Sequence, residues 1–273
     1  MPAIPARTPR PSGSQPADAG QVARSFGAEA GRYDRARPGY PDELVAAIMA
    51  ASPGPRVLDV GCGTGISSRR FQAAGCEVLG IDPDARMAEV ARQHGIAVEI
   101  SSIEDWDPAR RTFDIVVAGQ AWHWVDPLAG AVKAGQALRP GGRLAPFWNV
   151  FQPPPDLAAA FAAVYGRVLP DLPVNLWARP ALDAYAGVFR TVGDGIRRAD
   201  GFGQPEQWRF DWACDYTRDE WLDQVPTQGN QHRLPPAQLE ELLAGIGAAI
   251  DAVGGRFTMG YAAIVVTAQR AGP

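Results

Sequence analysis

Three glycines and one aspartate are spaced in a way that suits the binding of a nucleotide-like cofactor. Gly61, Gly63 and Gly65 follow an apolar run at 57–60, and without Cβ atoms they leave room for a tight turn or a close-lying ligand. A second apolar run ends at Asp82, about 20 residues beyond the first glycine, the distance found in doubly wound folds. A carboxylate there can accept hydrogen bonds from both hydroxyls of a ribose. The pattern therefore predicts a cofactor site at the carboxyl end of a parallel sheet.

The glycine spacing differs from that of dinucleotide-binding proteins. Those proteins need a G-x-G-x-x-G pattern, whose last glycine lets helix and strand pack closely. Here the third glycine comes one residue early and is followed by Ile66, and an acidic residue, Asp59, precedes the first glycine. An NAD-dependent oxidoreductase is therefore an alternative that the spacing disfavours.

The stretch at 57–65 resembles motif I of the class I S-adenosylmethionine (SAM)-dependent methyltransferases. The resemblance implies that SAM is the cofactor, that the glycines approach its methionyl part and ribose, and that Asp82 binds the ribose. Two further family marks are the aromatic His-Trp sequence at 122–124 and the Leu-x-Pro-Gly-Gly sequence at 138–142. Asp82 could instead cap the helix that follows it, but Asp84 is well placed for that role.

The segment at 26–41 resembles the N-terminal segment of small-molecule methyltransferases of the trans-aconitate and the ubiquinone/menaquinone-biosynthesis types. In those relatives the segment folds over the cofactor, which implies that Tyr33 and Arg37 bind SAM here. The forked donors of an arginine suit the methionyl carboxylate. The alternative is a helix that covers one face of the sheet, with Tyr33 in the core.

The loop after the expected third strand, residues 101–106, departs from the family pattern. In the resembling family an acid followed by a small residue holds the adenine amino group, and here Ser102 stands where the acid is usual. The backbone of Ile103 can still serve, because a main-chain N–H needs no particular side chain. Trp106 covers the adenine or fills the core. The cofactor residues that the resemblance implies are Tyr33, Arg37, Asp59, Gly61, Cys62, Gly63, Gly65, Asp82, Pro83, Ser102, Ile103, Glu104 and Gln120.

His123 is the candidate catalytic residue. It follows the expected fourth strand (113–118), on a loop that lies beside the glycine turn in an open parallel sheet. A neutral imidazole could take a proton from a hydroxyl nucleophile or orient a carboxylate, and the alternative is a structural histidine between two tryptophans. We favour orientation, because methyl transfer to a carboxylate requires no base. The candidate acceptor-binding residues are Trp122, Trp124, Trp148 and Trp177.

Apolar runs that suit strands alternate with helical patterns along most of the chain. This order predicts an α/β fold with a doubly wound, Rossmann-like sheet. The resemblance implies seven strands, mostly parallel, with an antiparallel last strand; we expect the fifth strand to end at Trp148. We predict five segments: a disordered tail (1–20), an N-terminal helical cap (21–51), a SAM-binding core (52–149), a helical substrate lid (150–205) and a segment that completes the sheet (206–273).

Composition narrows the range of partners. The net charge of −4 argues against a general affinity for nucleic acids or anionic membranes. Three scattered cysteines are too few for a disulfide framework or a zinc cluster, so we expect a cytoplasmic protein with no metal. No apolar run reaches the length of a membrane span. We expect a monomer or a homodimer with a small-molecule substrate.

Together these features predict a SAM-dependent methyltransferase that acts on a small-molecule acceptor. Carboxylate and hydroxyl acceptors are both open, and so are O- and C-methylation. The two alternatives are the NAD-dependent oxidoreductase and a protein that binds SAM without catalysis.

Overall fold

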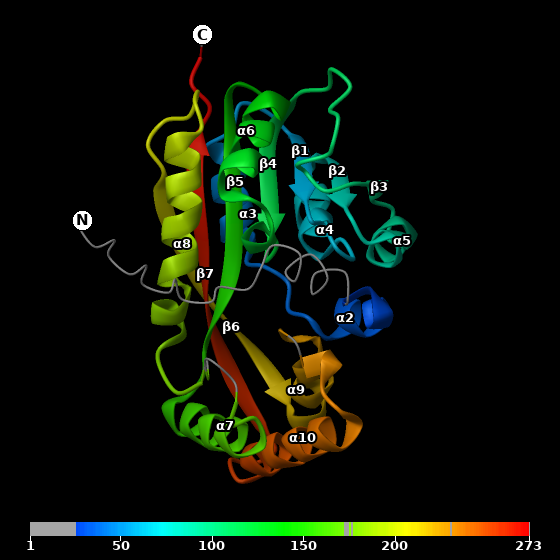
Figure 1. Ribbon diagram of the computed structural model, residues 1–273, viewed down its shortest axis with the longest axis vertical. Helices are drawn as coiled ribbons and strands as arrows, with labels where there is room; N and C mark the ends of the chain where they lie inside the picture. Colours follow the sequence, from blue (N-terminus) through cyan, green and yellow to red (C-terminus); the bar gives the residue numbers. More distant parts are fainter. Residues whose placement is uncertain (1–25, 172–174, 176, 230, 273) are drawn as a thin grey trace, which may run out of the picture.

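A twisted, mostly parallel sheet forms the centre of the computed structural model (Figure 1). The structure describes residues 26–171, 175, 177–229 and 231–272, so the tail predicted at 1–20 lies outside it. Within this part the strand order is β3-β2-β1-β4-β5-β7-β6, and β7 pairs antiparallel with both β5 and β6, whereas the other pairs are parallel. The strands are β1 (Arg56–Val60), β2 (Glu77–Asp82), β3 (Ala97–Ile100), β4 (Phe113–Gly119), β5 (Leu138–Gln152), β6 (Glu206–Thr217) and β7 (Arg256–Gln269). The predicted fold class is confirmed.

Helices cover both faces of the sheet. α3 and α4 pack on one face, α6 and α8 pack on the other, and α5 packs beside β3. None of the helices in the described part is both long and apolar enough to cross a membrane. The helices are α2 (Ala30–Ala36), α3 (Asp42–Ala50), α4 (Ile66–Ala73), α5 (Ala85–Gln93), α6 (Pro127–Ala137), α7 (Pro155–Val168), α8 (Ala181–Arg198), α9 (Arg218–Gln224) and α10 (Pro236–Asp251). The 3-10 turns among the described residues are η1 (Phe26–Glu29), η2 (Trp122–Trp124), η3 (Val225–Thr227) and η4 (Gln231–Arg233).

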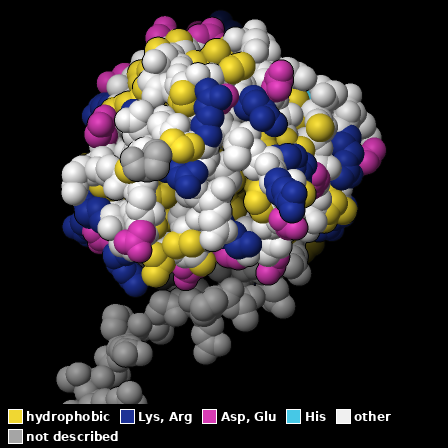
Figure 2. All heavy atoms as spheres, turned by 90° about the horizontal axis from the view of Figure 1, so that it is seen from above, with side chains coloured by type: hydrophobic (Ala, Val, Ile, Leu, Met, Phe, Trp, Pro, Cys, Tyr) yellow, Lys and Arg dark blue, Asp and Glu magenta, His cyan; other side chains and the backbone are white. Residues whose placement is uncertain are grey.

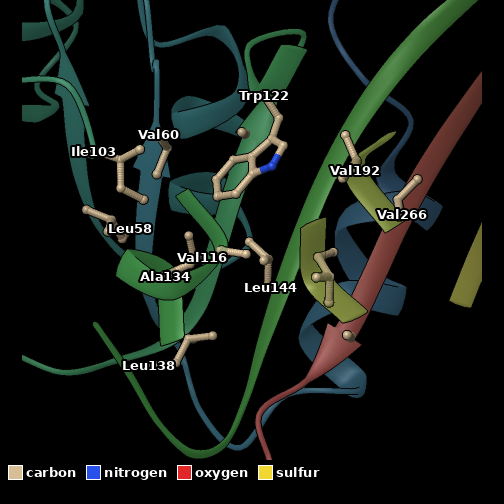
Figure 3. Packing of buried hydrophobic residues seen from close by; sticks show 14 of the residues in the cluster. Leu58, Val60, Ile103, Val116, Trp122, Ala134, Leu138, Leu144, Val192 and Val266 are labelled. Atoms are coloured by element: carbon tan, nitrogen blue, oxygen red, sulfur yellow. The ribbon is translucent and has the colours of Figure 1, made fainter. Parts of the chain in front are cut away.

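The first strand shows why its sequence forms a central strand. Val57 packs with α3 and α4, whereas Leu58 and Val60 belong to the cluster on the α6 and α8 face. Successive side chains of a strand point to opposite faces, so apolar residues at both odd and even positions suit a strand covered on both sides. Figure 3 shows Leu58 and Val60 on this second face, together with Val116 of β4.

A second hydrophobic cluster lies beyond the carboxyl edge of the sheet, where β5, β6 and β7 extend past the other strands. α7, α9 and α10 pack there around Trp221, which is fully buried, and Phe161 stacks on its indole. Figure 1 shows these helices together below the sheet. The predicted end of the fifth strand at Trp148 is wrong, because residues 149–152 pair with β7. This pairing joins segments far apart in the chain, which local sequence patterns do not reveal.

The segment predicted as a lid, 150–205, divides between these two regions. α7 belongs to the second cluster and contributes to the wall of a pocket. α8 instead packs against α6 and the sheet, where Val192 and Ile196 are buried. The larger part of α8 is therefore core structure.

Candidate cofactor and acceptor site

A pocket of about 1030 Å³ lies between the carboxyl edge of the sheet and the cluster of α7, α9 and α10. Its volume is at the upper end of the range for small-molecule sites. It is lined by the glycine loop, by the loops after β2, β3 and β4, by α2, and by α7 and the start of α8. Of the residues predicted for the site, thirteen line it: Tyr33, Arg37, Gly61, Gly63, Asp82, Pro83, Ser102, Ile103, Glu104, Gln120, His123, Trp124 and Trp177.

The glycine loop turns tightly against the end of β2. The backbone N–H groups of Gly61 and Cys62 donate to the carbonyl oxygen of Ile81 at 2.8 and 3.1 Å. Gly61 has φ +63°, and a Cβ on it would lie 2.6 Å from the Cβ of Ala121. Real Cβ atoms do not come so close, and the backbone conformation is also one that other residues rarely adopt. Glycine is therefore required at this position for both reasons.

Asp82 lies where the loops after β1 and β2 meet. Its Oδ2 accepts from the backbone N–H of Gly63, and its Oδ1 accepts from that of Asp84, both at 2.8 Å. Two carboxylate oxygens provide about four acceptor positions, so capacity remains for hydroxyl donors from the pocket. Burial raises the pKa of Asp82 to about 6. Asp84 caps α5 by accepting from the N–H of Arg86, as expected. The role predicted for Asp82, binding a ribose, stays a prediction.

Helix α2 spans the space between the sheet and the second cluster. On the sheet side, Asp34 accepts from Arg69 of α4 at 2.8 Å and contacts Nε2 of His94 at 2.9 Å. On the other side, Arg32 and Arg35 both pair with the carboxylate of Asp223 in α9, at 2.8 and 3.0 Å. The helix is thus held at both sides by ion pairs, while its own Tyr33 and its C-terminal neighbour Arg37 line the pocket.

Arg37 brings a positive charge to the pocket. Its guanidinium lies 5.0 Å from the centre of the Tyr33 ring, and its Nε has no hydrogen-bond partner. Within the described part of the chain no carboxylate forms an ion pair with it. The backbone that carries it is fixed by Asn149 of β5, whose amide donates to the carbonyl of Gly39 at 2.8 Å. A forked cation held without an acidic partner suits a carboxylate ligand.

His123 lies in η2, after β4, and its ring lines the pocket. Nδ1 of the ring lies 3.2 Å from Nε1 of Trp148, whose N–H donates to it. The ring is accessible from the pocket although protein surrounds it, and this burial, together with the charge of Arg37, lowers the pKa of His123 to about 4. Trp124 lies against it, with ring centres 4.5 Å apart.

Comparisons with known proteins agree with this geometry. Residues 57–142 match the family model described as a methyltransferase domain. The chain carries a class I methyltransferase domain. An uncharacterised methyltransferase of Mycobacterium tuberculosis is 38% identical over 128 residues, which are 46% of this chain and 52% of that protein. A malonyl-[acyl-carrier protein] O-methyltransferase of Enterobacter lignolyticus is 36% identical over 158 residues, 55% of this chain and 61% of that protein.

The chain thus spans about half to three fifths of the length of these relatives. Among solved structures, a protein described as a type II methyltransferase from Anaeromyxobacter dehalogenans matches with a TM-score of 0.62 at 22% identity. The match covers 85% of this chain and 97% of that one, and at this identity it shows the shared fold. The resemblance to class I methyltransferases is confirmed.

Five residues predicted for the site of the methyltransferase domain do not line the pocket. Three of them support the glycine loop. Asp59 is fully buried, and its Oδ2 accepts from the hydroxyls of Ser67 and Ser68 in α4, each at 2.6 Å. Gly65 is the N-cap of α4 with φ +85°, and Cys62 packs with α5 in the core. These three residues match the family motif because they support the glycine loop from the side of the core.

The other two residues off the pocket are tryptophans in the core. Trp122 is buried between the sheet and α6, and Figure 3 shows its indole among the apolar side chains of this face. Trp148 is also fully buried, packs on Phe189 of α8, and reaches the pocket only through His123. Trp148 belongs to the set of alternate residues of β5 that face the core, and this alternation is a sequence signal for a buried position.

The loop after β3 presents its backbone and Ile103 to the pocket. The Ser102 hydroxyl donates to Asp105 at 3.0 Å, so this side chain is bonded within the loop. Glu104 accepts from the N–H of Asp126 at 3.0 Å and joins this loop to the start of α6. Trp106 does not line the pocket; it is buried and donates to Glu99 at 2.6 Å. Of its two predicted roles, the core position is the one observed.

Several lining residues were missed by sequence reasoning. They come mainly from the far wall and from the strand extension: Met87, Phe151, Ala158, Ala159, Ala162, Tyr165, Arg179, Tyr185, Gln228 and Gln231. The run of small alanines on one side of α7 was the available signal, because small side chains leave space beside a helix. The rest depend on how α7, α8 and α9 fold back towards the sheet.

Proposed function

We propose that this protein transfers the methyl group of SAM to a small-molecule acceptor, at an oxygen or a carbon atom. The observation that carries the proposal is a single pocket lined at one end by the glycine loop and Asp82, and also by His123 and Trp124. A cofactor at the glycine loop and an acceptor at the histidine would share this space. The similarity to a malonyl-[acyl-carrier protein] O-methyltransferase supports an oxygen atom of a carboxylic acid as the acceptor.

The residues present fit SAM. In this proposal Asp82 accepts from the ribose hydroxyls, the backbone of Ile103 meets the adenine, and Arg37 pairs with the methionyl carboxylate, for which it has no competing acid among the described residues. When bound, SAM supplies an electrophilic methyl group on a positively charged sulfur. The chain holds the acceptor in line with that group and excludes water, which are the main contributions a protein makes to such a displacement.

Helix α2 supports the exclusion of water. It crosses from α4 and α5 to α9, and Tyr33 and Arg37 line the pocket beneath it. We propose that the part of the predicted lid formed by α7 and residues 177–180 shapes the acceptor end, because these residues line the pocket opposite the glycine loop. We further propose a cytoplasmic protein, on the ground of its cysteine content.

The proposal is tested by methyl transfer from SAM that carries a radiolabelled methyl group. The purified protein is incubated with labelled SAM and a small-molecule extract of its source cells. We expect a labelled small molecule and an equal amount of S-adenosylhomocysteine. Binding of SAM without any labelled product would instead favour the non-catalytic alternative.

A further inference from the structure

The contact between Trp148 and His123 fixes which nitrogen of the imidazole carries a proton. An indole N–H can only donate, so Nδ1 of His123, 3.2 Å away, must be the acceptor and carry no proton. The proton of the neutral ring then resides on Nε2. Trp148 is fully buried on β5 and packs on Phe189, so the donor is held in place by the core.

A base at this position is incompatible with that arrangement. Nε2 already carries a proton, and Nδ1 is occupied by Trp148. A second proton would leave two N–H groups facing each other at Nδ1, and burial and the charge of Arg37 also oppose the imidazolium. What His123 offers to the pocket is therefore an N–H donor.

The charged residues that line the pocket indicate which kind of acceptor it favours. Among the described lining residues the carboxylates are Asp82, at the end of β2, and Glu104, on the loop after β3. Arg179 is a lining cation besides Arg37, which the proposed function pairs with the methionyl carboxylate, and the walls of α7 and Trp177 are apolar. A sulfonium cofactor adds a further positive charge. This end of the pocket favours an anion with an apolar body.

We propose that His123 is a fixed hydrogen-bond donor held by Trp148, and that the acceptor is an organic oxyanion already ionised before it binds. The proposal rests on the proposed function and names its substrate class. The acceptor oxygen, held by the Nε2–H of His123, forms the O–CH₃ bond as the S–CH₃ bond breaks, and the electron pair of that bond returns to sulfur. No proton moves, so no base is needed.

The tautomer is measured by ¹⁵N NMR of the imidazole nitrogens, without cofactor or substrate. The chain has only three histidines, and the spectrum of His123→Gln assigns the signals. We expect Nε2 protonated, Nδ1 unprotonated, and no titration of His123 between pH 8 and about 5. Trp148→Phe should produce a mixture of tautomers, whereas Trp208→Phe, which removes an indole that donates to Glu206, should not. A proton on Nδ1, or a titration near the ordinary pKa, would overturn the proposal.

The substrate class is measured by calorimetry on the protein loaded with S-adenosylhomocysteine. The probes are phenylacetate and its neutral counterparts phenylacetamide and 2-phenylethanol. We expect phenylacetate to bind at least about 10-fold more tightly, because a hydrogen bond to a charged group is worth more than one to a neutral group. His123→Gln keeps an N–H donor and should retain most of this preference, whereas His123→Leu should lose it.

Equal binding of the three probes, or no binding of any of them, would contradict the anionic acceptor. If His123→Gln and His123→Leu lose the preference for phenylacetate equally, the donor role of His123 is contradicted. A failure of SAM to bind would contradict the proposed function instead, and it would leave the NMR result on the tautomer standing.

Discussion

At the scale of single residues, Asp82 is the group whose ionisation should control cofactor affinity. Its pKa is raised to about 6 by burial, and ribose hydroxyls need the ionised form as acceptor. Below that pH, binding must first remove a proton, so the dissociation constant of SAM should rise by up to about 10-fold per pH unit. Between pH 7 and 8 the Asp82 carboxyl is already ionised, so its titration should not change the dissociation constant of SAM.

Calorimetry of SAM binding from pH 5 to 8 checks this dependence, with Asp82→Asn as the control that should bind weakly at every pH. Titration of Asp59 and Asp82, the two acids with raised pKa values, does not weaken SAM binding at low pH by unfolding the protein. A carboxyl with a raised pKa in the fold binds more protons when folded, so its contribution to the free energy of unfolding increases as the pH falls towards 4. An affinity that is the same at pH 5 and pH 7.5 would exclude the assigned role.

Gly61 allows a matched comparison between backbone strain and steric clash. Gly61 and Gly75 both have positive φ, of +63° and +91°. A Cβ on Gly61 would meet Ala121, whereas one on Gly75 would meet nothing within 4 Å. Each alanine substitution should cost about 1 kcal/mol of stability for the left-handed backbone.

Only Gly61→Ala should also displace the glycine loop. We expect it to lower the melting temperature further than Gly75→Ala and to weaken SAM binding more than about 10-fold, while Gly75→Ala binds SAM as the wild type does. Thermal unfolding and calorimetry of both variants provide the comparison. Equal SAM affinities for the two variants would show that the loop tolerates a side chain.

At the scale of elements, helix α2 owes its position to charges from two separate parts of the chain. Asp223→Asn removes the partner that Arg32 and Arg35 share, and each such exposed pair is worth about 0.2–1 kcal/mol. Because two pairs are lost, amide hydrogen exchange at 30–36 should become roughly two- to thirty-fold faster, with exchange of the central strands unchanged. Asp211→Asn, which removes an exposed pair on β6, is the control and should leave α2 as it is. Unchanged exchange in Asp223→Asn would show that α2 is held by other contacts.

The elements that sequence patterns predicted well are those with local signals. The glycines and Asp82 were recognised by spacing, and the cap formed by Asp84 by its place before α5. The end of β5 was not recognised, because residues 149–152 read as a loop until β7 pairs with them. Asn149 and Asp223 were missed for the same reason: each acts on a segment more than 100 residues away.

At the scale of the whole molecule, the pocket lies between two hydrophobic clusters, one around the sheet and one around Trp221. Long strands β5, β6 and β7 join them, and α2 crosses between them on the side of the pocket. Charged side chains of both signs are interspersed over the face seen in Figure 2. The positive charge of Arg37 acts on His123 locally, although the overall charge is −4. Composition alone indicated no such local charge.

The central claim is that SAM binds at the glycine loop with its ribose on Asp82, and its most direct test is calorimetric titration of three proteins. These are the wild type, Asp82→Ala, and the control Asp200→Ala, which changes an exposed aspartate after α8. We predict that the wild type and Asp200→Ala bind SAM equally, and that Asp82→Ala binds it about 10- to 100-fold more weakly, the worth of hydrogen bonds to a charged group. Unchanged SAM affinity in Asp82→Ala, or tighter binding of NAD than of SAM by the wild type, would contradict the account.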